Sequence, residues 1–413
     1  MMRSTITLIV GGIIYAAGYS TLLFADDWPQ WRGVNRDGIS KETIPTNASG
    51  SYSPEIAWTK NLGTGCSSMI VVGDKLYTMG NKSDQDIVYC LDVASGDSLW
   101  TFKYACELDA RQFEGGPGAT PIFVDGKIIT LSHEGHLYCL DAATGKEIWK
   151  THLIDDLRGD RPKWGFSGSP LVLDDKVYVD AGGTSGVVCL SLKDGSKVWA
   201  SKGRQGGASY GAPISIGEGS STSVAFFRAQ GLEAFKADDG SREWSYPWKT
   251  SWDINATTPL LAGNSLYASS GYGSGAFMLK LGGSNPKEIW TNKEFQNQMT
   301  TPVLKDGYLY GAHVQHVGKK KSLAYKCVKW DTGEIAWTDK SIAMAATILV
   351  GDKLMILTQN GDLIIAEPSP KKFALLSQTN VLSGGRSWVD PIFSRGNAYC
   401  RNNEGELVKV SFN

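Results

Sequence analysis

The sequence contains the stretch Cys139-Leu140-Asp141-Ala142-Ala143-Thr144-Gly145-Lys146-Glu147-Ile148-Trp149. All or part of this pattern returns along the chain, with its last residue at Trp58, Trp100, Trp199, Trp244, Trp290, Trp337 and, as a phenylalanine, Phe373. From Trp58 to Phe373 the copies span 315 residues in seven steps, which is a mean period of 45 residues. A fixed period of this length indicates a repeat architecture.

Two further signals recur in phase with the first. Turn dipeptides such as Asp125-Gly126 precede short apolar runs such as Lys127-Ile128-Ile129, and dipeptides such as Thr120-Pro121 come shortly before the turns. Such turns suit tight hairpins, and proline is tolerated at the first residue of a strand. Each repeat therefore predicts four antiparallel strands, which is the blade of a β-propeller.

The two ends of the chain complement each other. The last unit, 388–412, predicts three strands, whereas 52–62 predicts a single strand that ends a repeat. Joined together they make an eighth blade and leave no open edge. We therefore predict an all-β protein with one eight-bladed propeller over residues 55–413, whose last blade is closed by the N-terminal strand. Seven blades remain the alternative if the irregular unit 364–382 does not form.

The first 25 residues predict a signal peptide. Arg3 is followed by a nearly uncharged apolar run that ends before Asp26-Asp27, with cleavage expected after Ala25. An uncleaved N-terminal anchor is the alternative. We expect residues 26–54 to form a leader that packs on the propeller, and the protein to be exported to the periplasm, the cell envelope or the medium. No later segment predicts a transmembrane helix.

The composition excludes several classes of protein. The chain has 14 Trp, 16 Tyr and 13 Phe, and its 41 basic and 42 acidic residues leave a net charge of −1. Disordered chains have few aromatic residues and a high net charge, and nucleic-acid-binding proteins present a basic face. We therefore expect a folded protein that does not bind nucleic acid.

The stretch Asp141–Trp149 resembles the tryptophan-docking motif of the PQQ (pyrrolo-quinoline quinone) repeat. That repeat builds eight-bladed quinoprotein dehydrogenases, the non-enzymatic outer-membrane-assembly lipoprotein and many exported PQQ-like proteins. The segment Asp27–Ser40 is similar to the start of exported members. The resemblance implies that the repeated tryptophan packs between blades, against the glycine turn of a neighbour. The residues given this structural role are Trp58, Trp100, Trp149, Trp199, Trp244, Trp290 and Trp337.

Seven cysteines are an odd number for an exported protein. Cys90, Cys139, Cys189 and Cys327 occupy one repeat position in different blades, so we interpret them as small buried hydrophobic residues. Cys66 and Cys106 fall in equivalent loops of adjacent blades, and we predict a disulfide between them.

The loops on one face of the propeller carry the candidate ligand-binding residues. Aromatic side chains beside Arg, Asp and Asn on one rim could hold a sugar, a peptide or a ring. The candidates are Arg111, Trp164, Tyr210, Trp252, Asp253, Asn255, Arg386 and Trp388. Asp253 and Asn255 come nearest to a catalytic acid with an amide partner, although two residues at this spacing specify little.

The sequence argues against a quinone site and against a metal site. Enzymes of the resembled family commonly cover the quinone with a disulfide between adjacent cysteines, and this chain has no such pair and is shorter. The pair His133 and His136 and the pair His313 and His316 are expected in two different blades, too far apart to share a metal, and all four are expected to be solvent-facing turn residues. We predict no cofactor and no metal.

The leading hypothesis is an exported propeller that binds an unidentified protein or carbohydrate of the cell envelope on its loop face, without catalysis of its own. The alternative is a PQQ- and calcium-dependent dehydrogenase that oxidises an alcohol or a sugar. A sugar- or peptide-binding module at the cell surface is the third hypothesis.

Overall fold

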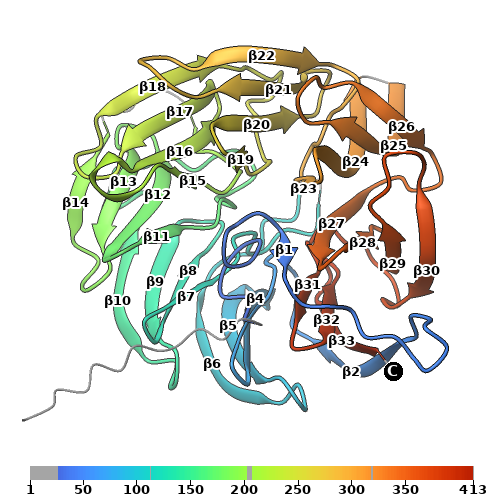
Figure 1. Ribbon diagram of the computed structural model, residues 1–413. Coiled ribbons are helices and arrows are strands. Elements are labelled where there is room, and N and C mark those ends of the chain that lie inside the picture. Colours follow the sequence, from blue (N-terminus) through green and yellow to red (C-terminus); the bar gives the residue numbers. More distant parts are fainter. Residues whose placement is uncertain (1–26, 112, 202–206, 318–319, 413) are drawn as a thin grey trace, which may run out of the picture.

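A computed structural model describes residues 27–412, except for residues 112, 202–206 and 318–319. The predicted signal peptide, 1–25, lies outside the described residues. Eight sheets are arranged around a central axis as a β-propeller (Figure 1), and the described helix is one short 3₁₀ turn, Gly219–Ser221. The predicted eight-bladed, all-β fold is confirmed.

Blades 1 to 4 each contain four consecutive antiparallel strands, ordered from the central channel outward. Blade 1 has β3 (Ile70–Val72), β4 (Lys75–Lys82), β5 (Gln85–Asp92) and β6 (Ser98–Ala105). Blade 2 has β7 (Ile122–Val124), β8 (Lys127–Leu131), β9 (His136–Asp141) and β10 (Glu147–His152). Blade 3 has β11 (Leu171–Leu173), β12 (Lys176–Gly182), β13 (Gly186–Ser191) and β14 (Lys197–Ala200). Blade 4 has β15 (Ile214–Ile216), β16 (Ser223–Arg228), β17 (Gly231–Lys236) and β18 (Arg242–Pro247).

Blades 5 and 6 repeat this order, and blades 7 and 8 add strands from the N-terminal region. Blade 5 has β19 (Leu260–Ala262), β20 (Ser265–Ser270), β21 (Gly275–Lys280) and β22 (Lys287–Asn292). Blade 6 has β23 (Val303–Lys305), β24 (Tyr308–Val317), β25 (Lys320–Lys329) and β26 (Ile335–Asp339). Blade 7 has β27 (Ala345–Val350), β28 (Lys353–Thr358), β29 (Asp362–Glu367) and β30 (Ala374–Asn380), with β1 (Ile39–Ser40) parallel to β27. Blade 8 has β31 (Ile392–Ser394), β32 (Asn397–Arg401), β33 (Glu406–Phe412) and β2 (Pro54–Asn61).

The ring closes where the two ends of the chain pair. Strand β2 lies antiparallel to β33, with Pro54 opposite Phe412 and Asn61 opposite Glu406. The irregular unit also forms a blade, in which the Phe373 ring packs at 6.1 Å from the Trp337 ring. The seven-bladed alternative is therefore wrong.

Each outer-strand tryptophan contacts the following blade. The Trp100 Nε1 group donates a hydrogen bond to the main-chain carbonyl of Ala142 at 3.1 Å, and the indole lies beside Gly145. Gly145 has φ +72, and a Cβ atom there would lie 2.5 Å from the indole ring, so glycine meets both demands. Equivalent Nε1 hydrogen bonds to the next blade are made by Trp58, Trp149, Trp199, Trp290 and Trp337. Trp244 is buried at the same repeat position. The four repeat cysteines are also buried.

The leader enters the central channel, where it appears as the blue segment inside the ring (Figure 1). Arg32 is fully buried, pairs with Asp390 at 2.8 Å and donates to the main-chain carbonyls of Thr301 and Pro302. Arg36, also buried, donates to the main-chain carbonyls of Ser169 and Pro170. These partners lie just before the innermost strands of three blades, so the leader closes the channel from within.

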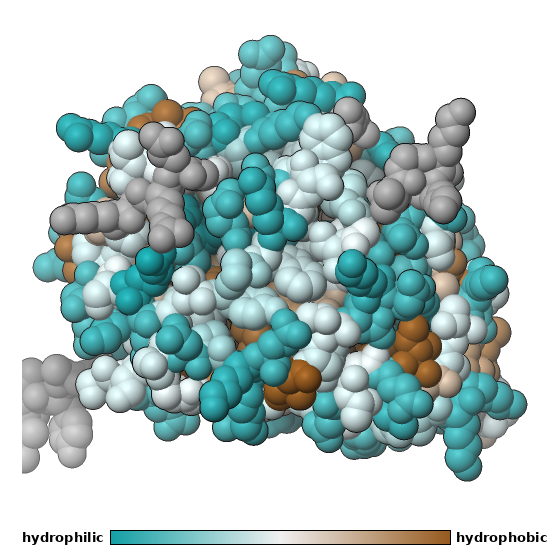
Figure 2. Space-filling view, turned by 90° about the horizontal axis from the view of Figure 1, so that it is seen from above, coloured by the Kyte–Doolittle hydropathy of each residue, from teal (hydrophilic) through white to brown (hydrophobic). Residues whose placement is uncertain are grey.

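The surface in Figure 2 is mainly hydrophilic, with hydrophobic residues in small separate patches. Large exposed hydrophobic side chains in the outer strands include Leu99, Ile148, Val198 and Ile289. Among the described residues, no helix is both long and apolar enough to cross a membrane.

Candidate binding site on the loop face

A cavity of about 470 Å³ opens at the loop end of the central channel. This volume falls within the range of small-ligand pockets, about 300–1,000 Å³. Trp31 of the leader contributes to its lining from the channel side, and its Nε1 donates to the Thr258 hydroxyl at 2.8 Å. The other aromatic and sulfur-containing lining residues are Cys66, Phe113, Trp164, Phe166, Tyr210, Tyr272, Met299, Met344 and Trp388.

Aromatic rings from three loops are in contact around this cavity. The Phe113 ring lies 6.2 Å from Trp164 and 6.3 Å from Trp388, and these loops precede blades 2, 3 and 8. The guanidinium group of Arg386 lies 4.7 Å from the Trp388 ring centroid. The lining therefore offers flat apolar surfaces on several sides, with a cation above one of them.

Arg386 is held in place by an ion pair. Its Nη2 lies 2.7 Å from Glu114, which also accepts a hydrogen bond from Asn403 at 2.9 Å. Burial raises the pKa of Glu114, but the hydrogen bonds from Asn403 and Arg386 outweigh it and hold this pKa below its ordinary value. The charge of Arg386 is therefore largely neutralised before any ligand arrives.

Two buried polar atoms of lining residues lack a partner among the described residues. They are the Nε1 donor of Trp388 and the Oε1 acceptor of Gln298. The amide nitrogen of Gln298 is already used, since it donates to the Tyr272 hydroxyl at 2.8 Å. Buried polar groups are normally satisfied, so one unpaired donor and one unpaired acceptor suggest a ligand that carries both.

The cavity unites only half of the residues predicted to bind a ligand. Trp164, Tyr210, Arg386 and Trp388 line it. The Tyr210 hydroxyl accepts a hydrogen bond from the Trp164 main-chain N–H at 3.4 Å, and burial raises the Tyr210 pKa, so this tyrosine stays neutral.

Four predicted residues do not line the cavity. Asn255 is buried, and its side chain bonds Arg228, Trp248 and Ser270, so it holds loop backbone in place. Asp253 is exposed and adopts φ +54 in a turn. The predicted acid–amide pair is therefore not assembled, because the turn sends the two side chains to different environments.

Trp252 and Arg111 also lie apart from the cavity. Trp252 is 59% exposed, with the Lys163 ammonium 5.1 Å from its ring centroid. Arg111 is exposed and pairs with Asp109 at 2.7 Å in a separate groove between blades 1 and 2.

The predicted disulfide is not formed, since Cys66 and Cys106 are both free thiols. Cys66 borders the central cavity, where burial raises its pKa to about 12. Cys106 instead lies 3.8 Å from Nδ1 of His133. The expectation of solvent-facing histidines is also wrong for His133 and His313, which are 3% and 1% exposed because loop backbone covers both.

Residues 83–339 match the protein family described as outer membrane protein assembly factor BamB. This match covers more than half of the chain. The chain belongs to the BamB family. No curated protein matches the sequence closely enough to add to this assignment.

Solved structures place the BamB-family chain among propellers of two kinds. BamB from Moraxella catarrhalis is 16% identical, with a TM-score of 0.63 over 87% of this chain and 98% of the other. Quinohemoprotein alcohol dehydrogenase from Comamonas testosteroni is 14% identical, with a TM-score of 0.67 over 93% and 80%. A europium-containing methanol dehydrogenase is 16% identical, with a TM-score of 0.64 over 94% and 89%. These likenesses establish the fold.

The donor set of the cavity does not fit PQQ with a calcium ion. PQQ is a flat anionic quinone, and calcium takes six to eight oxygen ligands, several of them carboxylates. Among the described lining residues none is Asp or Glu, and Arg386, already paired with Glu114, is the one arginine or lysine. The rings of this BamB-family chain could sandwich a flat group, but they could not balance its charges.

Several lining residues could not be singled out from the sequence. Trp31 belongs to the leader, and Tyr272, Gln298, Met299 and Met344 come from blades 5 to 7. The one sequence signal was the density of aromatic residues in the leader and the loops. Their convergence depends on the leader, which long-range contacts hold in the channel.

Proposed function

We propose that this protein is an exported, non-catalytic binding scaffold of the cell envelope that holds a segment of a partner protein in the loop-face cavity. The observation that carries the proposal is the lining: aromatic and sulfur-containing side chains surround one unpaired donor and one unpaired acceptor. A peptide segment offers apolar side chains together with carbonyl acceptors and N–H donors. BamB-family membership supports a protein partner, because the family is that of an outer membrane protein assembly factor.

Burial of a partner's aromatic or aliphatic side chain in the cavity would supply the affinity. A fully buried large apolar side chain contributes about 1.5–3 kcal/mol, and a hydrogen bond adds about 0.5–1.5 kcal/mol. Trp388 Nε1 would donate to a carbonyl of the partner, and Gln298 Oε1 would accept from an N–H. Arg386 stays with Glu114 and orients the Trp388 ring.

Site-specific photo-crosslinking tests this function. A photoreactive phenylalanine analogue replaces Phe113 at the cavity and, as the matched control, Leu99, which is 50% exposed on outer strand β6. We expect a discrete adduct with an envelope protein from position 113, its loss in the Trp388→Ala background, and no such adduct from position 99. Equal adducts from both positions, or an adduct that survives Trp388→Ala, would contradict the proposal.

A further inference from the structure

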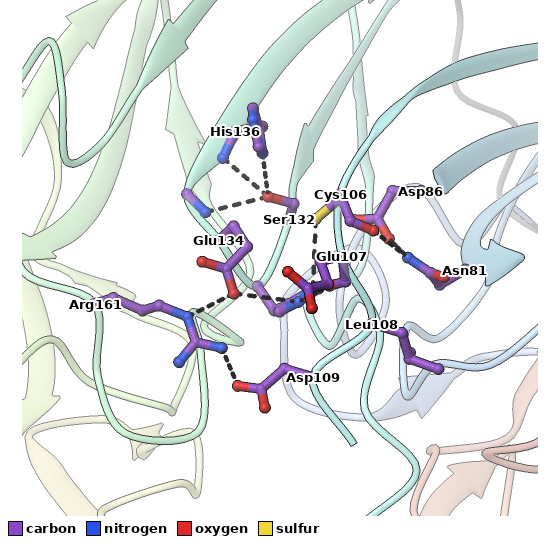
Figure 3. Close-up of polar contacts among 12 residues, drawn as sticks. Asn81, Asp86, Cys106, Glu107, Leu108, Asp109, Ser132, Glu134, His136 and Arg161 are labelled. Atoms are coloured by element: carbon purple, nitrogen blue, oxygen red, sulfur yellow. Dashed lines mark hydrogen bonds and ion pairs between the residues drawn. The ribbon is translucent and has the colours of Figure 1, made fainter. Parts of the chain in front are cut away.

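A second cluster of polar side chains lies between blades 1 and 2, and one of its members, His133, also borders the central cavity. Asp86 of β5, Cys106 just after β6, and His133 between β8 and β9 place their ligand atoms within 4.8 Å of one another. All three are buried, at 0%, 4% and 3% exposure. Figure 3 shows Asp86 and Cys106 side by side, with Asn81 next to them.

The spacing of these atoms suits a transition metal. The Cys106 Sγ and His133 Nδ1 atoms are 3.8 Å apart. Zinc lies about 2.3 Å from sulfur and about 2.0 Å from nitrogen, which puts two tetrahedral ligands about 3.5 Å apart. A shift of a few tenths of an ångström would therefore let both atoms coordinate one ion.

Neighbouring groups orient two of the three side chains. The His133 Nε2 atom lies 3.0 Å from the main-chain carbonyl of Glu107. A carbonyl only accepts, so Nε2 carries the ring proton and the lone pair of Nδ1 points to Cys106. This carbonyl-anchored tautomer is the usual arrangement of metal-binding histidines. Asn81 donates to Asp86 and to the Cys106 carbonyl, each at 2.8 Å, and so aligns both residues.

An adjoining groove offers a route for a cation. Cys106 lines a cavity of about 700 Å³ whose other polar lining residues are Asp84, Glu107, Asp109, Arg111, Glu134, His136 and His152. Four carboxylates face one arginine in the lining and a second arginine beside it, so this entrance keeps a negative balance. Beside this groove, Arg161 forms one ion pair with Glu134, at 2.8 Å, and a second ion pair with Asp109 (Figure 3).

We propose that Asp86, Cys106 and His133 bind a divalent transition metal of the borderline class, represented by Zn²⁺, and that this ion links blade 1 to blade 2. On binding, Cys106 loses its thiol proton to solvent and Sγ, Nδ1 of His133 and a carboxylate oxygen of Asp86 donate to the ion. One coordination position remains for water. A sulfur, a nitrogen and an oxygen ligand together favour Zn²⁺ over the oxygen-seeking Ca²⁺ and Mg²⁺.

Metal titration of the full chain tests this site. After removal of bound metal with a chelator, wild type should take up one equivalent of Zn²⁺, and Co²⁺ should produce thiolate-to-cobalt charge-transfer absorption. Cys106→Ser and Asp86→Asn should each weaken Zn²⁺ binding at least about 100-fold, because loss of an outer-shell partner alone weakens it about 10–100-fold. Cys66→Ser removes a thiol that borders the other cavity and should leave binding unchanged.

X-ray absorption spectroscopy of the zinc-loaded wild-type protein needs no variant, so it tests the proposed site even if a substituted chain fails to fold. We expect one sulfur ligand together with nitrogen and oxygen ligands. No saturable uptake by wild type, a zinc spectrum without sulfur, or an unchanged cobalt band in folded Cys106→Ser would overturn the proposal.

Discussion

Substitution of a repeat glycine should show how strongly the tryptophan contacts hold neighbouring blades together. Gly145 and Gly126 both lie in blade 2 with almost the same backbone conformation, φ +72 and φ +71. A Cβ atom at Gly145 would lie 2.5 Å from the Trp100 indole, whereas at Gly126 nothing lies within 4 Å. The two positions therefore share the same φ, and Gly145 differs from Gly126 in its contact with the indole of blade 1.

The expected losses of stability follow from this difference. Left-handed backbone costs a non-glycine residue about 1–2 kcal/mol, so Gly126→Ala should lower the free energy of unfolding by about that amount. Gly145→Ala has the same backbone penalty and also displaces Trp100 from its 3.1 Å hydrogen bond to Ala142. Overpacking adds about 1–3 kcal/mol, which brings the expected loss to about 2–5 kcal/mol.

Urea unfolding followed by tryptophan fluorescence measures both variants, and near-ultraviolet circular dichroism reports the environment of the indole. We expect Gly145→Ala to unfold at clearly lower urea concentration than Gly126→Ala and to change the aromatic spectrum. Equal midpoints and an unchanged spectrum would refute the idea that the indole–glycine contact joins the blades.

Two further predictions concern the leader and a buried histidine. Arg32→Met leaves Asp390 buried without its partner and should lower stability by about 3–5 kcal/mol, with faster proteolysis at residues 27–53 in limited digestion. Resistance equal to wild type would argue against a leader that Arg32 anchors in the channel. Burial, together with the charge of Lys326, lowers the pKa of His313 to about 4, below the ordinary value of about 6.5, so the unfolded chain binds the proton first. Stability is then fully present above about pH 6.5 and falls by up to about 3 kcal/mol towards pH 4, and His313→Gln should flatten this part of the pH profile measured by urea unfolding. A profile that His313→Gln leaves unchanged would assign the acid sensitivity to other groups.

The blades could be predicted because their signals are local and repeated. Each hairpin turn and each Trp100-like strand is encoded within a few residues, and eight copies reinforce the same interpretation. Closure by β2 and β33 was also predictable, since the two incomplete units complement each other.

The site depends on contacts that no periodic signal announces. Arg32 meets Asp390 across 358 positions of sequence, and Trp31 reaches Thr258 across 227. Asn255 was predicted to bind a ligand beside Asp253, but its side-chain amide instead donates hydrogen bonds to the main-chain carbonyls of Arg228 and Trp248. The sequence prediction paired Cys106 with Cys66 and so missed its cluster with His133. That cluster forms because the loop after β6 folds over the β8–β9 turn.

Calorimetric titration with peptides tests most directly whether the loop-face cavity holds a partner segment. Soluble peptides with one central phenylalanine or tryptophan are compared with matched peptides that carry serine there, and PQQ with Ca²⁺ is titrated in parallel. We predict saturable binding of the aromatic peptides with a negative heat-capacity change, its loss in Trp388→Ala, and its retention in Trp252→Ala, whose side chain lies outside the cavity. Saturable binding of PQQ with Ca²⁺ that supports dye-linked alcohol oxidation, together with no peptide binding, would contradict the account.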